Sequence, residues 1–160
     1  MTTRDLALAW QTLAQRKVEG ASHEAEQYLR KAVKEQADDA TVLSALGFVE
    51  LERGHEREAR ELYQDALKIR PRANTAATNL GIVEAREGNL RQAVALWQAA
   101  FERVPYRSAI GMNLAMAFCA AGQKEEARQY LRRVLEFNPD YKKAKQMLVR
   151  VNGDAGQCKQ

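Results

Sequence analysis

Apolar and small residues recur along this chain at an interval of about 34 residues. The segment GNLRQAVALWQAAFERVP, from Gly88 to Pro105, places alanines at positions 93 and 100 between its glycine and its proline. The same skeleton stands one interval earlier, from Gly54 to Pro71, and one interval later, from Gly122 to Pro139. A fainter copy begins at Gly20. A fixed period of this length predicts a repeat architecture.

Each repeat reads as two helices joined by a tight turn. In the third copy we expect one helix from about Asn74 and a second from about Leu90 to Arg103, with Gly88 between them. Glycine suits this turn because it reaches positive φ without a Cβ clash. A proline at the end of each second helix stops it, because proline cannot donate into a continuing helix.

The small residues predict close helix packing. The alanines at 93 and 100 are seven residues apart and therefore share one helical face, where a neighbouring helix approaches closely. In the first helices, Leu46, Leu80 and Leu114 stand in register, each followed by Gly or Ala. On these positions the chain resembles the tetratricopeptide repeat family, over roughly residues 5–141. That resemblance implies an all-α fold, a right-handed solenoid of helix-turn-helix units.

We expect one domain over residues 1–153. Its units span about 6–39, 40–73, 74–107 and 108–141, and a capping helix covers about 140–152. Ala144, Met147, Leu148 and Val151 form an apolar stripe on that helix, which would cover the open end of the stack. Gly153 is expected to end the helix, and residues 154–160 to form a flexible tail.

The sequence departs from the family pattern at several positions, and each departure leads to a structural expectation. In the first unit, the expected first helix contains WQTLA at Trp10 to Ala14 and is out of step by one residue with Gly20 and Ala25. Glu50 and Glu84 stand where the family commonly has an aromatic residue, and we expect them to be part-exposed or paired, because an unpaired buried charge is unfavourable. Lys17 is a candidate partner for Glu50.

Composition narrows the function classes. The net charge of +4 on 160 residues is dispersed, apart from an excess near Lys142 to Arg150, so nucleic acid is a disfavoured partner. No signal peptide or membrane span is evident, and we expect a cytoplasmic protein. Cys119 and Cys158 are expected to be free thiols.

We find no catalytic motif and expect no enzyme activity, no cofactor and no metal site. His23 and His55 occupy comparable places near hairpin turns and are interpreted as exposed turn residues rather than a catalytic pair.

The family resemblance implies that first helices line a concave groove that binds a protein or peptide. Helical geometry then selects the residues opposite the packed leucines. The expected peptide-binding groove comprises Thr41, Ser44, Phe48, Leu51, Glu52, Thr75, Thr78, Asn79, Ile82, Arg86, Met112, Asn113, Met116 and Lys143, with Cys119 and Gln146 beside them.

Asn79 and Asn113 are the sharpest candidates because they occupy the same position in successive repeats, each before a repeated leucine. In family members with an asparagine ladder here, the amides bind a peptide main chain. The alternative is a local structural role. A chaperone-type carboxylate clamp is disfavoured. With Asn79 as its middle residue, its remaining positions would fall on Ser44, Phe48, Ala109 and Asn113, and none of these residues fits the clamp.

These observations favour a non-enzymatic scaffold that binds a peptide segment or a partner helix. Two alternatives remain open. One is a homo-oligomer, or a self-covered chain, in which another copy or the tail covers the apolar lining. The other is a module of a larger enzyme or regulator.

Overall fold

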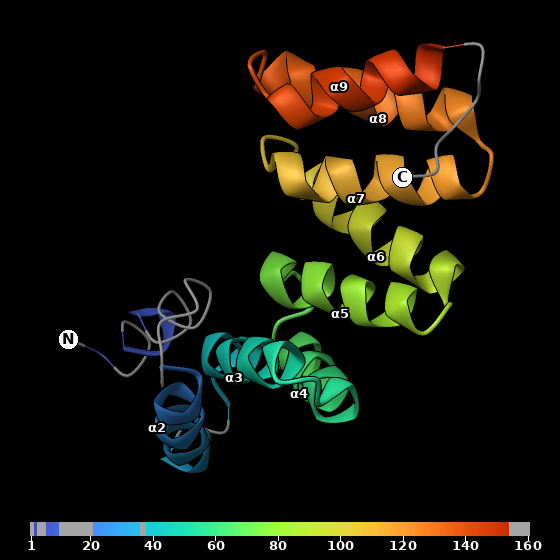
Figure 1. Cartoon of the computed structure of the whole chain (residues 1–160). Coiled ribbons are helices and arrows are strands. Elements are labelled where there is room, and N and C mark those ends of the chain that lie inside the picture. Colours follow the sequence, from blue (N-terminus) through green and yellow to red (C-terminus); the bar gives the residue numbers. More distant parts are fainter. Residues whose placement is uncertain (1, 3–5, 10–20, 36–37, 154–160) are drawn as a thin grey trace. The chain divides into compact units, whose positions relative to one another are not determined.

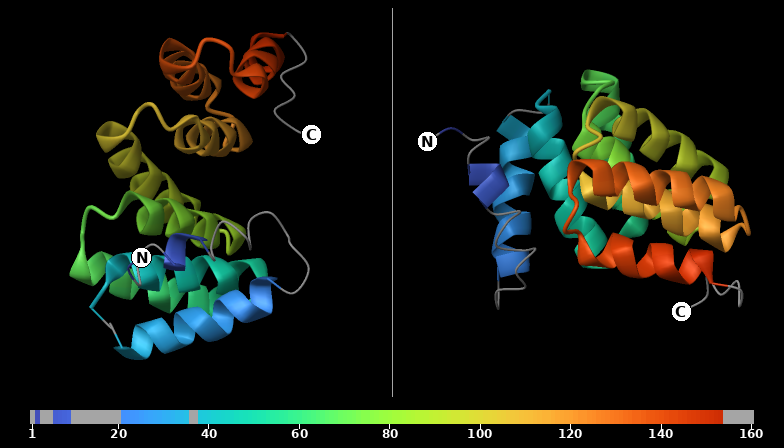
Figure 2. Two further views of the ribbon diagram at one scale, coloured as in Figure 1. Left: turned by 90° about the vertical axis from the view of Figure 1, so that its left-hand side faces the viewer. Right: turned by 90° about the horizontal axis from the view of Figure 1, so that it is seen from above.

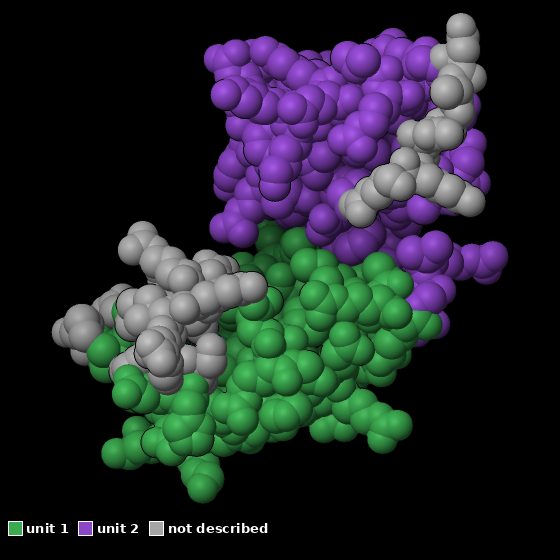
Figure 3. All heavy atoms as spheres, in the orientation of Figure 1, with its two compact units in different colours: residues 1–87 green, residues 88–160 purple. Residues whose placement is uncertain are grey.

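The structure is a computed structural model that describes residues 2, 6–9, 21–35 and 38–153 (Figure 1). These residues form helices and turns, and no strand occurs among them. The predicted all-α repeat fold is therefore confirmed. The chain divides into two compact units, residues 1–87 (unit 1) and 88–160 (unit 2), which Figure 3 colours separately.

Unit 1 contains four of the described helices: α2 (Ala21–Glu35), α3 (Ala40–Glu52), α4 (Glu56–Ile69) and α5 (Asn74–Arg86). Helices α3 and α4 pack together as a hairpin, α2 packs against α3, and α5 packs against α4 (Figures 1 and 2). Leu29 of α2 meets Val42, Leu46 and Val49 of α3 in a fully buried apolar cluster. This cluster holds α2 on the α3–α4 hairpin.

Unit 2 repeats the pattern with α6 (Leu90–Arg103), α7 (Ser108–Ala120), α8 (Lys124–Phe137) and α9 (Lys142–Asn152). Helices α7 and α8 form its hairpin, α6 packs on α7, and α9 packs on α8 (Figure 2). Phe101, Ile110, Leu114 and Leu131 are buried between these helices.

The turn predictions are confirmed. Gly54, Gly88 and Gly122 adopt φ angles of 83°, 86° and 77°, a backbone region that side chains with a Cβ rarely enter. Helices α4, α6 and α8 each end two residues before the proline of their repeat. The conformational limits of these two residue types thus explain the hairpin boundaries.

Small residues permit the close packing, as predicted. Ala59, Ala66, Ala93 and Ala100 are completely buried. Gly111 of α7 is tighter still, since a Cβ built there would lie 2.3 Å from Val134 Cγ2. No side chain fits at that point of the α7–α8 contact without displacing its neighbours.

Helix α9 presents the predicted stripe to its packed side: Ala144 and Val151 are buried, and Met147 and Leu148 are half-buried. Gly153 ends the helix, as expected. The predicted helix at Trp10 to Ala14, Lys17 and the tail at 154–160 lie outside the described residues. The boundaries predicted for the four sequence repeats and the single-domain organisation remain predictions.

Candidate functional site

The residues expected to line a groove on α3 differ in exposure. Thr41 and Phe48 are half-buried and Glu52 is exposed, whereas Ser44 and Leu51 are buried. The Ser44 hydroxyl donates to a backbone carbonyl one turn earlier, at 2.6 Å, and Phe48 packs against the α2–α3 cluster. Helix α3 therefore presents less side-chain surface to a partner than its sequence suggests.

Helix α5 presents more of the selected residues. Thr75, Thr78, Asn79 and Ile82 are half-buried, and Arg86 is exposed. The Thr78 hydroxyl donates to the backbone carbonyl one turn earlier, at 2.7 Å. The Arg86 guanidinium lies 3.4 Å from a Glu56 carboxylate oxygen on α4, so the end of this face is partly neutralised.

Helix α7 carries no charged residue at all. Met116 is 50% exposed and Asn113 is half-buried, but Met112, which the sequence predicts to line the groove, is buried in the core. On α9, Lys143 and Gln146 are exposed. The accessible part of α7 is thus apolar, with the adaptable side chain of Met116 and the amide of Asn113.

Tyr63 of α4, which sequence reasoning did not select, has a hydroxyl whose pKa is influenced by three of the selected residues. Its side chain is fully buried, and burial raises the pKa of its hydroxyl well above the ordinary range. The Asn79 amide opposes that rise, and the charges of Glu52 and Arg86 also act on the hydroxyl. No described residue forms a well-directed hydrogen bond with the hydroxyl. Candidates from α3 and α5 therefore influence the protonation of one buried phenol.

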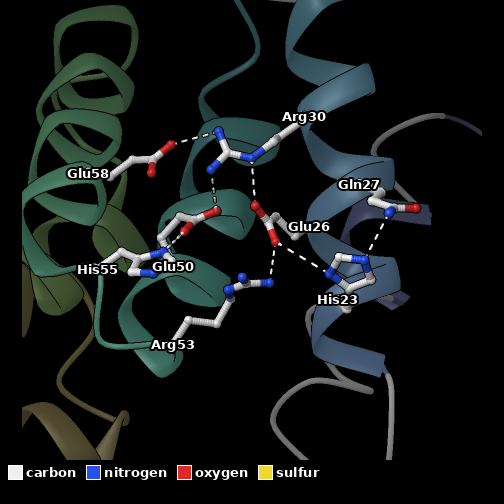
Figure 4. Close-up of polar contacts among 8 residues, drawn as sticks. All are labelled: His23, Glu26, Gln27, Arg30, Glu50, Arg53, His55 and Glu58. Atoms are coloured by element: carbon white, nitrogen blue, oxygen red, sulfur yellow. Dashed lines mark hydrogen bonds and ion pairs between the residues drawn. The ribbon is translucent and has the colours of Figure 1, made fainter.

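A second polar cluster joins α2, α3 and α4 (Figure 4). The Arg30 guanidinium donates to a carboxylate from each helix: Glu26 at 2.8 Å, Glu50 at 3.0 Å and Glu58 at 2.7 Å. Hydrogen bonds to Glu58 and Glu26 raise the pKa of Arg30 against the effect of burial. Glu50 is completely buried.

Both histidines contact this cluster. His55 Nδ1 lies 2.7 Å from the second Glu50 oxygen, and His23 Nδ1 lies 3.9 Å from Glu26, which also pairs with Arg53 (Figure 4). The side chains are 49% exposed for His55 and 68% for His23, so the expected exposure is right, but each also has a carboxylate partner.

The expectation that the two unusual glutamates are paired is confirmed, although both are buried rather than part-exposed. Glu50 pairs with Arg30. The Arg60 Nε donates a hydrogen bond to the Glu84 carboxylate at 3.0 Å, and Arg60 also forms an ion pair with Glu87. In each case an arginine of the preceding second helix reaches the glutamate, a contact that spacing along one helix does not reveal.

At the corresponding position in unit 2 the pairing is aromatic. Phe118, which occupies the place of Glu84 one repeat later, stacks on Tyr130 with ring centroids 5.5 Å apart. The Arg133 guanidinium lies 4.7 Å from the Phe101 ring centroid, where a cation–π contact forms. The two units therefore fill one repeat position with different chemistry.

Glu50, His55 and Glu58 bring three groups of metal-ligand type within 4.8 Å of one another. Arg30, however, already bonds to both carboxylates. Its guanidinium donates one hydrogen bond to each of them, so both carboxylates are already engaged by a cationic group. We therefore interpret the cluster as an ion-pair network that docks α2 onto the hairpin.

The contact between Arg30 and Glu26 in this network predicts how the free energy of unfolding depends on pH. The hydrogen bond from Arg30 is the largest cause that lowers the pKa of Glu26 below its ordinary 4.5. A lowered folded-state pKa stabilises the fold above the unfolded-state value, and that contribution is lost as pH falls through the folded-state pKa. Glu26→Gln should reduce the free energy of unfolding by about 1 kcal/mol at pH 7. The difference from wild type should shrink below about pH 4.5.

Urea titrations at pH 7, 5, 4 and 3 measure this difference, with Glu61→Gln on the exposed side of α4 as the control. A Glu26→Gln deficit that stays constant down to pH 3 would contradict the assignment.

One prediction about the cysteines is wrong. The sequence predicts a free thiol at Cys119, but this residue is disulfide-bonded in the structure. Cys158, the other cysteine of the chain, lies outside the described residues. Two cysteines are too few for a disulfide framework yet sufficient for one bond, and whether a bond forms depends on three-dimensional proximity.

Comparisons with known families decide what kind of repeat this is. Two tetratricopeptide repeat models match the chain, one over residues 45–90 and the other over residues 84–151. The chain belongs to the tetratricopeptide repeat family. Its family assignment agrees with the helical hairpins, the positive-φ glycines and the terminal prolines described above. No curated protein sequence matches this repeat protein.

Solved structures support the same fold. A structure titled for the functional characterisation of pilF from Pseudomonas aeruginosa aligns with a TM-score of 0.82 and 22% identity, covering 93% of this chain and 67% of its own. MamA from Desulfovibrio magneticus RS-1 aligns with a TM-score of 0.76 and 20% identity, covering 95% and 85%. At these identities the likeness concerns the fold.

Proposed function

We propose that this tetratricopeptide repeat protein is a non-enzymatic scaffold that binds a segment of a protein partner on its first helices α3, α5 and α7. The observation that carries the proposal is the pair Asn79 and Asn113. Both are half-buried, on α5 and α7, at equivalent repeat positions. An amide offers a donor and an acceptor, which matches the main chain of an extended peptide.

The surroundings of these amides support a protein ligand. Ile82 is half-buried on α5, and Met116 is half-exposed on α7, so each amide has an apolar neighbour on its own helix. Apolar surface with a few polar groups is typical of binding sites, and methionine adapts to different partner side chains. In the described part of the chain, no helix has both the length and the apolar composition needed to cross a membrane.

A binding experiment tests the proposal. Random 12-residue peptides displayed on phage are selected on the immobilised wild-type protein. The double variant Asn79→Ala with Asn113→Ala should bind the selected peptides about tenfold more weakly, because two hydrogen bonds of about 0.5–1.5 kcal/mol each are lost. Its melting temperature should stay close to that of wild type.

The matched control is Gln64→Ala with Gln129→Ala, two exposed residues of the second helices α4 and α8. The control should bind like wild type. If the asparagine variant binds normally, or if it unfolds, the amides have a structural role and the proposal fails.

Self-association is the second candidate function, and the exposure of Met116 favours it. Light scattering over a concentration series separates the candidates. A scaffold with a free binding face should keep the monomer mass of 18.0 kDa, whereas self-covering by another copy should double the mass as concentration rises.

A further inference from the structure

The disulfide at Cys119 ties the α7 part of the proposed binding face to another part of the chain. Cys119 is buried in the last turn of α7 and is disulfide-bonded. The chain has two cysteines, so a disulfide within one copy has a single possible partner, Cys158. A disulfide holds the Cα atoms of its two cysteines about 4.4–6.8 Å apart. The residues next to Cys158 are therefore brought to α7.

The repeat places the two cysteines within reach of each other. Cys119 and Gly153 are one repeat interval of 34 residues apart, at the ends of α7 and α9. Helix α8 packs on both helices and joins them through short turns, so α7 and α9 end on the same side of unit 2 (Figure 1). The five residues from Gly153 to Cys158 span about 17 Å when extended. That reach is nearly twice the spacing of packed helix axes, which is about 8–10 Å.

The disulfide lies beside the exposed apolar part of α7. Met116 precedes Cys119 by three residues, so the two side chains are neighbours on one face of the helix, and Met116 is 50% exposed. Asn113 precedes Met116 by another three residues and is half-buried. A segment bonded to Cys119 is therefore held next to the α7 residues that the proposed function assigns to partner binding.

We propose that residues 154–160 cover the partner-binding face of α7 while the disulfide between Cys119 and Cys158 is intact, and that reduction releases them. This inference rests on the proposed function, because it assigns a regulation to the same face. A short tether raises the local concentration of a segment to about the millimolar range, so even a weak contact competes with a partner. Reduction removes the tether and with it the competition.

The chemical step is thiol–disulfide exchange with a dithiol. One thiolate of the dithiol attacks a sulfur of the protein disulfide, forms a mixed disulfide and displaces the other cysteine as a thiolate. The second thiol of the dithiol then displaces the remaining cysteine and closes a cyclic disulfide. Two electrons and two protons pass from the dithiol to Cys119 and Cys158, so the dithiol is oxidised and the protein is reduced.

Peptide mapping tests the disulfide itself. Trypsin cleaves after lysine and arginine, so Cys119 falls in the peptide 108–124 and Cys158 in the peptide 151–159. After equilibration with oxidised glutathione, the two peptides should be recovered as one linked species that separates on reduction. The protein should keep its monomer mass in non-reducing electrophoresis. Free thiols at both cysteines, or a disulfide between two copies, would overturn the proposal.

Binding affinity tests the covering of α7. Cysteine-free random 12-residue peptides are selected on the reduced wild-type protein and kept only if Asn113→Ala weakens their binding. Wild type reduced with dithiothreitol should bind these peptides about tenfold more tightly than oxidised wild type, because the tethered competitor is released. Cys158→Ser should bind like reduced wild type, whether or not dithiothreitol is present.

The matched control is Gln157→Ala, which changes a neighbour of Cys158 and keeps both cysteines. Its affinity should respond to dithiothreitol as that of wild type does. An equal response of Cys158→Ser to dithiothreitol would overturn the inference, because that variant has no disulfide to reduce.

The failure of this inference and the failure of the proposed function give different results. If no selected peptide depends on Asn113, the proposed function fails, and the regulation falls with it. If peptides depend on Asn113 but bind oxidised and reduced wild type equally, the inference is overturned while the proposed function stands.

Discussion

Replacing Arg30 with methionine should lower the free energy of unfolding by about 3 kcal/mol, the lower end of the range for leaving a buried charge without its partner. The reason is Glu50, which is completely buried and keeps only His55 as a partner once the guanidinium is gone. Urea denaturation at pH 7, followed by circular dichroism, measures the change. The effect should be largest for α2, which Arg30 joins to α3 and α4.

Two variants check this explanation. Arg30→Met combined with Glu50→Leu should recover much of the lost stability, because the buried charge is removed together with its partner. Lys68→Met breaks an exposed pair with Asp65 and should change stability by less than about 1 kcal/mol. If Arg30→Met and Lys68→Met have equal effects, the network does not stabilise the docking of α2.

Gly111→Ala should destabilise unit 2 by about 1–3 kcal/mol although it adds a single methyl group. The new Cβ would lie 2.3 Å from Val134 Cγ2 and 3.0 Å from the Phe101 ring, both of which are buried. Relief requires α7 and α8 to separate. A lower melting temperature with unchanged helix content well below the transition is the expected observation.

The matched control is Gly153→Ala, because a Cβ there would meet only backbone oxygens at 3.6 and 3.7 Å. It should leave the melting temperature nearly unchanged. Combining Gly111→Ala with Val134→Ala should cost less than the sum of the two single changes, since the second makes room for the first. Strict additivity would mean that the contact between these two residues is not the source of the destabilisation.

The helical hairpins and their boundaries could be predicted from the sequence because they depend on local chemistry. A glycine that adopts positive φ and a proline that stops a helix act through their own backbone limits, and both recur once in each repeat from Gly54 to Pro139. The buried faces follow from helical periodicity, as the complete burial of Ala93 and Ala100 illustrates.

The partners of the polar groups could not be predicted in the same way. Arg30 and Glu50 are 20 residues apart on different helices, and the contact depends on how α2 packs against α3. The disulfide at Cys119 was likewise missed, because two cysteines in a sequence do not reveal their separation in space.

For the candidate site, too, the sequence predicted some features and only the tertiary structure decided others. The family resemblance implied a groove on the first helices, and helical periodicity then selected Asn79, Glu52 and Arg86 within it. Only the tertiary structure showed that Tyr63 of α4 lays its ring on Gly47 of α3, with its hydroxyl buried. Local propensity and the repeat period determine which helices form and which faces they bury, since both act within one helix or between adjacent ones. Packing between helices decides which side chains meet, because long side chains reach across elements by distances and directions that sequence spacing does not encode.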